Sequence, residues 1–221
     1  MHDMHNPDLL RLLPAGASSI IEIGCSSGAL AREYKKINPE CDYHGVEIDP
    51  AYVELAGRYC DSTELQNIEE VDLSFYRRNK HRDVWVFGDA LEHLRDPWGV
   101  LNNIRAVLPP TGVVVACIPN AQHWSVQVRL SLGAFRYEES GLLDRTHLRW
   151  FTKSTIIEMF NDADFSVSEG IPRIFDEPDR ERFLPLIGEI ARVAGADSQQ
   201  AILEATPLQY VVRAVPNVSG I

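Results

Sequence analysis

Residues Ile20 to Leu30 of the chain read IIEIGCSSGAL, and the stretch HGVEIDP (His44 to Pro50) follows later. A short apolar run passes Glu22 and then turns through Gly24 and Gly28. A strand that leads through a glycine turn into a helix presents backbone N–H groups and a helix N-terminus to a ligand. Glycine is needed there because a side chain would block close approach to the backbone. This stretch therefore predicts a nucleotide-type site at the end of a buried strand.

The spacing of the glycines narrows the choice of ligand. The dinucleotide pattern G-x-G-x-x-G would need glycines at the positions of Ser26 and Ala29. A pyrophosphate-binding turn is therefore poorly matched, which disfavours an NAD-dependent oxidoreductase. Glu47 ends the next predicted strand, where a carboxylate can accept both hydroxyls of a ribose. Asp49 competes for this role, but the alternation of side chains at the strand end favours Glu47.

Composition sets the broad class of the protein. The 221 residues are 45% hydrophobic and 24% charged, which is ordinary for one globular domain. A net charge of −11 argues against wrapping around nucleic acid, which needs a basic face. The four cysteines show no C-x-x-C spacing, so a zinc knuckle or redox pair is not expected. We find no signal peptide and no apolar run long enough to cross a bilayer, and therefore expect a cytoplasmic protein with reduced thiols.

Short apolar strands alternate with helical patterns through the first part of the chain. This alternation predicts a parallel sheet covered by helices on both faces. Pro50 suits the first turn of one helix, and Thr152 is a plausible N-cap of another. We predict strands at Ser19–Gly24, Asp42–Ile48, Ile68–Val71, Arg82–Asp89 and Gly112–Asn120, and two more strands near the C-terminus.

Two segments interrupt this pattern. Residues 121–151 carry aromatics and arginines but no strand signal, and a segment of that length between core elements is often an active-site lid. Residues 177–206 look helical and amphipathic, which predicts a helical insertion before the last strand. We expect residues 1–221 to form a single domain.

Four motifs in order resemble a known enzyme family. EIGCSSGAL, GVEIDP, DVWVFGDALEHLRDPWGVLNNIRAVLPPTGVVVACIPN and GLLDRTHLRWFT together resemble class I S-adenosylmethionine-dependent methyltransferases. The similarity is greatest to the subgroup found with bacterial polysaccharide and natural-product biosynthesis genes, and it covers roughly Ile20 to Phe165. It implies an α/β, Rossmann-like fold: a seven-stranded, mostly parallel sheet with the last strand antiparallel and helices on both faces.

The resemblance also implies a set of cofactor contacts. The methionine part of S-adenosylmethionine would lie over the glycine turn, its ribose on Glu47, and its adenine beside the region after the third strand. The family usually has glycine where this chain has Ser26, a change that trims the pocket without closing it. The residues implied to contact the cofactor are Glu22, Gly24, Cys25, Ser26, Gly28, Glu47, Ile48, Asp72, Leu73 and Asp89.

A second group of polar residues follows the fourth strand. Asp89, Glu92 and His93 in GDALEHL are spaced i, i+3 and i+4, so they share one face of a helical turn. Methyl transfer to a hydroxyl requires alignment of the acceptor and removal of a proton. His93 is a candidate base because imidazole titrates near neutral pH. Asp89 can contact the cofactor or the acceptor, and His147, at the end of the lid, is a second catalytic candidate.

The same residues permit a metal site as a less favoured alternative. Two carboxylates and a histidine on one face, with a fourth ligand from elsewhere, can bind a divalent cation. His147 and His123 are the available fourth ligands. The arrangement is similar to that of metal-dependent small-RNA 2′-O-methyltransferases and ubiquinone-pathway O-methyltransferases. Since EHL after the fourth strand also occurs in metal-free relatives, we predict a site without metal and keep Asp89, Glu92, His93 and His147 as the alternative ligand set.

The leading function is methyl transfer from S-adenosylmethionine to an oxygen, and less so a nitrogen, of a small molecule or sugar. The net negative charge of the chain suits such an acceptor better than a nucleic acid. A metal-dependent RNA 2′-O-methyltransferase and a non-catalytic cofactor-binding subunit are the alternatives. Neither the acceptor nor the oligomeric state follows from the sequence, and no membrane partner is expected.

Overall fold

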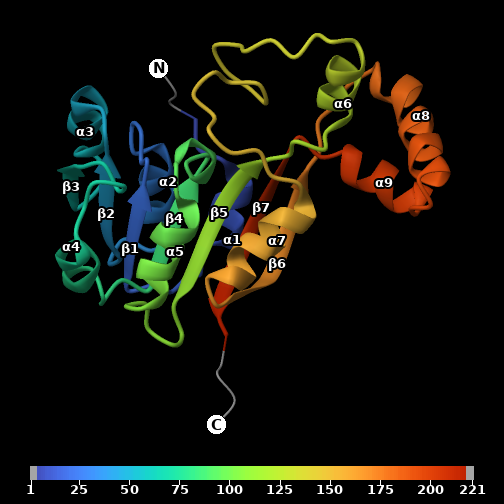
Figure 1. Cartoon of the computed structure of the whole chain (residues 1–221). Helices are drawn as coiled ribbons and strands as arrows, with labels where there is room; N and C mark the ends of the chain where they lie inside the picture. The colour runs from blue at the N-terminus through green and yellow to red at the C-terminus, as the bar shows by residue number, and fades with distance from the viewer. Residues whose placement is uncertain (1–3, 218–221) are drawn as a thin grey trace.

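The computed structural model describes residues 4–217 and contains one seven-stranded sheet (Figure 1). The strand order is β3-β2-β1-β4-β5-β7-β6, and only β7 runs antiparallel to its neighbours. This confirms the predicted mostly parallel sheet with a reversed last strand. The strands are β1 (Ser19–Ile23), β2 (Asp42–Glu47), β3 (Ser62–Leu65), β4 (Val84–Gly88), β5 (Val113–Pro119), β6 (Phe165–Arg173) and β7 (Gln209–Pro216).

Helices cover both faces of the sheet, as predicted. The α-helices are α1 (Pro7–Leu12), α2 (Ala29–Ile37), α3 (Pro50–Ala56), α4 (Leu73–Arg78), α5 (Pro97–Arg105), α6 (Trp124–Ser131), α7 (Lys153–Asp162), α8 (Arg180–Val193) and α9 (Ser198–Ala205), and η1 (Leu91–His93) is a short 3₁₀ turn. Proline opens α1, α3 and α5, where its missing N–H costs no hydrogen bond. Thr152 caps α7 in a capping box, which confirms its predicted role.

The sheet separates two hydrophobic clusters. One packs α4, α5 and α7 against one face of the sheet, around the fully buried Trp85. The other packs α1, α2 and α3 against the opposite face, around Tyr34 and Tyr43. Because both faces are covered, the central strands β1, β4 and β5 are almost continuously apolar and buried, as expected for parallel strands.

The third strand differs from the prediction. The expected strand at Ile68–Val71 is wrong, because β3 lies at Ser62–Leu65 and pairs with β2 in parallel register. As an edge strand it is short and half exposed, so it lacks the apolar run that marks the other strands. Ile68 is buried in the first cluster from an irregular segment, which explains its hydrophobic character.

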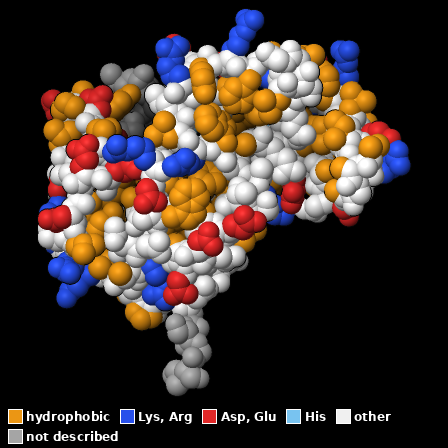
Figure 2. All heavy atoms as spheres, viewed as in Figure 1, with side chains coloured by type: hydrophobic (Ala, Val, Ile, Leu, Met, Phe, Trp, Pro, Cys, Tyr) orange, Lys and Arg blue, Asp and Glu red, His pale blue; other side chains and the backbone are white. Residues whose placement is uncertain are grey.

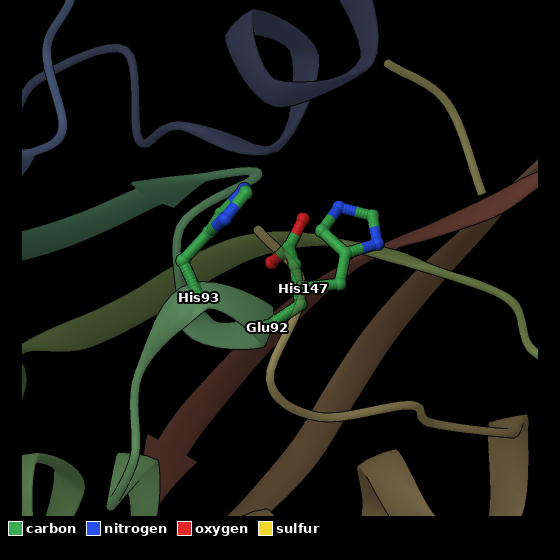
Figure 3. A group of neighbouring side chains, drawn as sticks. All are labelled: Glu92, His93 and His147. Atoms are coloured by element: carbon green, nitrogen blue, oxygen red, sulfur yellow. The ribbon is translucent and has the colours of Figure 1, made fainter. Parts of the chain in front are cut away.

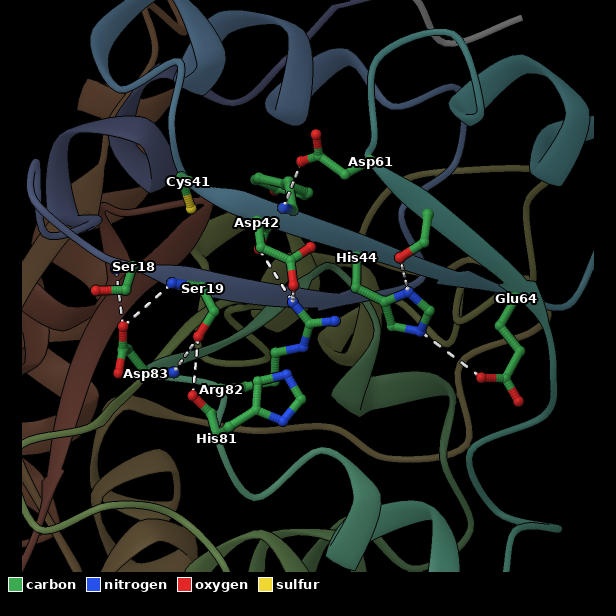
Figure 4. Close-up of polar contacts among 12 residues, drawn as sticks. Ser18, Ser19, Cys41, Asp42, His44, Asp61, Glu64, His81, Arg82 and Asp83 are labelled. Atoms are coloured by element: carbon green, nitrogen blue, oxygen red, sulfur yellow. Dashed lines mark hydrogen bonds and ion pairs between the residues drawn. The ribbon is translucent and has the colours of Figure 1, made fainter.

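Polar contacts fasten the strands together near their N-terminal ends (Figure 4). The carboxylate of Asp83 accepts hydrogen bonds from the backbone N–H groups of Ser18 and Ser19 at 2.8 and 3.1 Å. Arg82 forms an ion pair of 2.6 Å with Asp42 on β2. His44 contacts the hydroxyl of Ser62 on β3 at 2.8 Å between Nδ1 and Oγ. The polar side chains at this end of the sheet thus hold neighbouring strands together. The candidate site lies at the opposite end.

The segment 121–151 crosses the carboxyl ends of the strands (Figure 1, yellow-green to yellow). It begins with α6 and continues as irregular chain held by two isolated bridges, Asn120↔Phe151 and Glu138↔Asp144. Hydrophobic side chains gather on the visible face of this region and over α8 and α9 (Figure 2). The exposed hydrophobic residues of the segment include Leu130, Leu132, Tyr137 and Trp150.

The predicted helical insertion is present as α8 and α9. The two helices pack on each other and on α6, where the Trp124 and Phe183 rings stack with centroids 5.5 Å apart. Within residues 4–217, no helix combines the length and apolar character needed to span a membrane.

Candidate active site

A cavity of about 900 Å³ opens at the carboxyl ends of β1, β2 and β4. In open α/β sheets ligands bind in the crevice at this end of the strands. Its size is within the range of small-molecule and cofactor sites. Its walls include the glycine turn (residues 22–27, 29 and 30), the end of β2, residues 66–69, and residues 88–90 and 92–95 after β4. Further wall residues come from the lid (Ser140, Gly141, Leu142, Asp144 and His147) and from distant segments (Met4, His5, Asn6, Leu9, Pro119, Leu208 and Gln209).

The glycine turn forms as the sequence predicts. Gly24 and Gly28 have φ values of +75° and +76°, in the left-handed region that favours glycine. The N–H groups of Gly24 and Cys25 donate to the carbonyl of Val46 at 2.8 and 3.2 Å, which fastens the turn to β2. A side chain at Gly28 would meet the backbone of Ala56 at 3.0 Å, so this glycine also allows close helix packing.

Ser26 occupies the middle of the turn with φ +48°. Such a conformation is uncommon for a residue other than glycine, asparagine or aspartate and is found mainly where surrounding contacts enforce it. Here the backbone N–H of Ser26 donates to the carboxylate of Glu47 at 2.8 Å. This hydrogen bond holds the backbone of Ser26 in the turn, at the border of the cavity.

Glu47 rather than Asp49 faces the cavity, in agreement with the alternation argument. Its Oε2 accepts from Ser26, and its Oε1 accepts from the N–H groups of Ile48 at 2.8 Å and Asp49 at 3.2 Å. A carboxylate can accept about four hydrogen bonds, so at least one position remains for a ligand hydroxyl. The side chain of Asp49 instead caps α3 by accepting from Ala51.

The structure corrects the predicted contacts after the third strand. Asp72 caps α4 by accepting from Ser74 N–H at 2.8 Å, and Leu73 is half exposed on that helix. Neither residue lines the cavity; residues 66–69 do so instead. Asp72 and Leu73 were predicted as contacts because the third strand was predicted too late in the chain. The residues that reach the cavity are those immediately after β3 as it is observed.

Glu22 is a buried acid below the turn. It is 5% exposed, and the hydroxyl of Tyr43 donates to its carboxylate at 2.8 Å. Burial raises the pKa of Glu22 to about 8, an effect that the hydrogen bond from Tyr43 opposes and the charge of Glu47 reinforces. Near neutral pH this carboxyl is therefore largely protonated.

This raised pKa predicts a specific dependence of stability on pH. Because the folded state holds the Glu22 proton more tightly than the unfolded chain, its contribution to the free energy of unfolding is complete below the ordinary pKa of 4.5 and is lost as pH rises towards about 8. Urea unfolding of Glu22→Gln and of the native chain is measured at about pH 4 and about pH 8.5, on either side of the two pKa values. We expect the variant to lose less stability than the native chain between these two pH values. Equal losses in both proteins would contradict the assignment.

The turn after β4 brings three other residues together (Figure 3). Glu92 and His93 lie on η1, and His147 comes from the end of the lid segment. One possible ligand atom from each of the three lies within 4.8 Å of the others. The two imidazole rings meet edge to face with centroids 4.8 Å apart. The sequence prediction that His93 and His147 meet at one site is consistent with this geometry.

Backbone contacts hold the lid segment against η1. The carbonyl of Glu92 accepts from the N–H groups of Leu148 and Arg149 at 2.8 and 3.0 Å. His93 Nδ1 lies 3.2 Å from the carbonyl oxygen of Thr146, and His147 Nδ1 lies 3.3 Å from that of Leu142. The two imidazoles are thus fixed by main-chain oxygens on adjoining elements.

Glu92 is the most unusual group in the cavity wall. Its side chain is 1% exposed, and neither carboxylate oxygen has a hydrogen-bond partner. Burial, reinforced by the charge of Asp89, raises its pKa well above the ordinary value. Burial and the neighbouring His93 lower the pKa of His147, so that its ring is neutral near pH 7.

Two residues of the predicted cluster lie elsewhere. Asp89 precedes η1 with φ +56° and accepts a hydrogen bond from Gln209 on β7, so it does not join the group of Glu92, His93 and His147. The predicted shared helical face fails because the helical turn begins only at Leu91. His123 caps α6 and contacts Glu177 at 3.1 Å, which excludes it as a further ligand of this group.

Other cavity residues carried no recognisable sequence signal. Asn6 and Leu9 come from the start of the chain, and Gln209 comes from the last strand. Thr146 does not line the cavity, but it contacts His93 and donates its hydroxyl hydrogen to Asp144 at 2.6 Å. Only the folded sheet brings these segments to one end, so no local pattern could have assigned them to the site.

A comparison with known families identifies the protein. The family described as "Methyltransferase domain" matches residues 5–169. The chain belongs to this family. With the sheet order and the glycine turn, it is a class I S-adenosylmethionine-dependent methyltransferase.

Solved methyltransferases share the fold at low sequence identity. An S-adenosylmethionine-dependent methyltransferase from Thermotoga maritima has a TM-score of 0.61 and 16% identity, with 95% of this chain and 88% of that chain covered. The plantazolicin methyltransferase BpumL, in complex with S-adenosylhomocysteine, has a TM-score of 0.58 and 17% identity, with 91% and 77% covered. The O-methyltransferase from a trans-AT polyketide multienzyme of Brevibacillus brevis has a TM-score of 0.57 and 15% identity, with 96% and 71% covered. No curated protein matches this methyltransferase.

The cavity of this methyltransferase fits S-adenosylmethionine. Gly24, in the left-handed region, leaves the backbone of the turn open where it lines the cavity, whereas Gly28, also predicted as a cofactor contact, does not line it. Glu47 offers a carboxylate with spare acceptor capacity at the end of β2. Gln66, Asn67 and Ile68 border the same space beyond the strand. S-adenosylmethionine needs a hydrogen-bond acceptor for its ribose hydroxyls and an open backbone beside its methionine part, and the cavity offers both.

Proposed function

We propose that the protein transfers the methyl group of S-adenosylmethionine to a hydroxyl oxygen of a small-molecule or sugar acceptor. The observation that supports this most directly is the position of the Glu92, His93 and His147 group, which borders the same cavity as the glycine turn. A methyl donor held over the turn and an acceptor held at this group would share one enclosed space. Such proximity is the main requirement for an in-line transfer.

In this proposal the glycine turn Glu22–Gly28, with Cys25 and Ser26, would hold the methionine part of the cofactor. Glu47 and Ile48 would hold the ribose, and residues 66–69 the adenine. When bound, the cofactor supplies a sulfonium methyl group that a nucleophile can displace. Asp89, which is fixed by Gln209 on the cavity wall, would contact the cofactor or acceptor.

His93 and His147 would promote loss of the hydroxyl proton from the acceptor. Nδ1 of each ring faces a backbone carbonyl, which can only accept a hydrogen bond, so Nδ1 carries the hydrogen and Nε2 carries a lone pair. The lowered pKa of His147 keeps its ring neutral at the pH where the reaction would run.

We infer that residues 121–151 act as a lid of a single domain that spans the chain. Ser140, Leu142, Asp144 and His147 from this segment line the cavity, so it supplies side chains on the acceptor side. The wall also contains Glu47, Glu69, Asp89 and Asp144, a negative surface that suits a neutral or cationic acceptor better than RNA. The O-methyltransferase from Brevibacillus brevis is one solved relative in fold that acts on oxygen, which agrees with this proposal.

The direct test combines binding with turnover. Calorimetry with S-adenosylmethionine and S-adenosylhomocysteine should show one site per chain. A panel of phenols, sugars, amines and short RNAs with methyl-labelled cofactor should then give label on a hydroxyl compound. Cofactor binding without transfer to any class would favour a non-catalytic subunit, and label on RNA or amines alone would contradict the proposed acceptor class.

A further inference from the structure

The group of Glu92, His93 and His147 has the composition of a metal site. Figure 3 shows the three side chains pointing to the same side, with Glu92 and His93 on η1 and His147 on the adjoining segment. One ligand atom of each lies within 4.8 Å of the others. Two ligands on opposite sides of one transition-metal ion are at most about 4.4 Å apart. Only one pair of the three can lie opposite, and neighbouring ligands of such an ion are about 3.0 to 3.4 Å apart. Side-chain movements of up to roughly 1 to 2 Å would bring all three into coordinating range.

Each imidazole is already held in the orientation that a ligand needs. His93 Nδ1 donates to the Thr146 carbonyl, and Thr146 in turn donates its hydroxyl hydrogen to Asp144. His147 Nδ1 donates to the carbonyl of Leu142. A metal-binding histidine typically donates its other ring N–H to a carbonyl or carboxylate in this way. The Nε2 lone pairs of both rings are left available.

The state of Glu92 is the independent observation that points to a ligand. Both of its oxygens are buried without a partner, and a buried carboxylate without compensation costs several kcal/mol. Protonation would remove the charge but would still leave the O–H and the carbonyl oxygen without hydrogen bonds. A bound cation would satisfy the carboxylate directly. The negative charges of Asp89 and Asp144 nearby would also favour a cation.

We propose that Glu92, His93 and His147 bind one divalent transition-metal ion, such as Mn²⁺, Fe²⁺, Co²⁺ or Zn²⁺. Two imidazoles and one carboxylate suit these ions better than Mg²⁺ or Ca²⁺, which prefer oxygen ligands alone. Asp89 is not a ligand, because it belongs to a separate contact with Gln209. The proposed site thus has three of the four ligands that the sequence suggested as an alternative, and it lacks Asp89.

Three protein ligands leave coordination positions open towards the cavity, as in catalytic metal sites. This step rests on the proposed O-methylation: the acceptor hydroxyl would occupy an open position, where coordination lowers its pKa and the proton leaves to water. The oxygen–carbon bond then forms as the carbon–sulfur bond of the donor breaks, which leaves a neutral thioether. His93 and His147 would thus act on the proton through the cation that they hold.

The binding test is independent of methyl transfer. Protein treated with a chelator is titrated with Mn²⁺ and the free ion is followed by electron paramagnetic resonance, because Mn²⁺ avoids the four thiols. We expect one Mn²⁺ per chain, at least tenfold weaker binding in Glu92→Gln, and loss of binding in His147→Ala. His81→Ala, which removes an exposed imidazole at the opposite end of the sheet, should bind as the native chain does.

Two outcomes would overturn this assignment. One is that Mn²⁺, Co²⁺ and Zn²⁺ all fail to bind; the other is equal binding by the native chain and by His147→Ala. Calorimetry with S-adenosylmethionine on the same metal-stripped protein separates this failure from failure of the proposed function. If the cofactor binds and the stripped protein transfers methyl at the full rate, the imidazoles act as bases directly, and the role of the metal in transfer is refuted while O-methylation stands.

Discussion

Gly24→Val is expected to weaken binding of S-adenosylmethionine by at least about 100-fold, which corresponds to about 3 kcal/mol. Gly24 has φ +75°, a conformation that a β-branched residue adopts only with strain. Its added side chain would also stand in the wall of the cavity, where the backbone must remain open to the ligand. Isothermal titration calorimetry with S-adenosylmethionine measures the effect.

Gly16→Val is the matched control for this variant. Gly16 lies in a turn outside the cavity wall, has no positive φ, and an added Cβ there would meet no atom within 4 Å. It should bind the cofactor as the native chain does. A thermal melt of each variant shows whether the fold is intact. Near-native affinity in folded Gly24→Val would contradict the placement of the cofactor over the turn.

The fold was largely predictable because its strongest signals are local. The buried strands around Ile21, Trp85 and Val115 are apolar on both faces, and a parallel sheet covered by helices is the arrangement that requires this. Left-handed glycine, proline at helix starts and the Thr152 cap mark the ends of the elements. Each of these signals depends on neighbours along the chain, so one sequence suffices to find it.

The errors arose where tertiary contacts decide the structure. β3 has a mixed polar surface because it lies at the sheet edge, so its position depends on pairing with β2 rather than on hydrophobicity. The same error placed Asp72 in the predicted site, although it caps α4 outside the cavity. The separation of Asp89 from Glu92 depends on the late start of η1 and on a contact with Gln209 across the sheet. The spacing of residues along the chain predicts neither the start of η1 nor the contact with Gln209.

The lid and the Glu92 turn form one connected unit. Leu148 and Arg149 donate backbone hydrogen bonds to the carbonyl of Glu92, and Arg149 also donates from its guanidinium to the carbonyl of Arg95. Because His147 adjoins these contacts, movement of the lid away from η1 would also remove one imidazole from the group. Completion of the acceptor site would thus be coupled to closure of the segment over the cavity.

His93→Ala and His147→Ala are each expected to lower kcat for the identified hydroxyl acceptor by about 10²- to 10⁴-fold, the usual contribution of a group that moves a proton. The affinity for S-adenosylmethionine should remain within about threefold of the native value, because neither ring belongs to the glycine turn or to Glu47. Single-turnover kinetics with labelled cofactor give the first quantity and calorimetry gives the second.

The double variant His93→Ala, His147→Ala shows whether the two imidazoles act as a unit. Residues that serve one chemical function are strongly non-additive, so the double variant should be little slower than the slower single variant. His81→Ala, with its ring exposed away from the cavity, should retain the native rate. Multiplicative losses would assign independent roles to His93 and His147. Native rates in both single variants would show that transfer depends only on the positions of donor and acceptor.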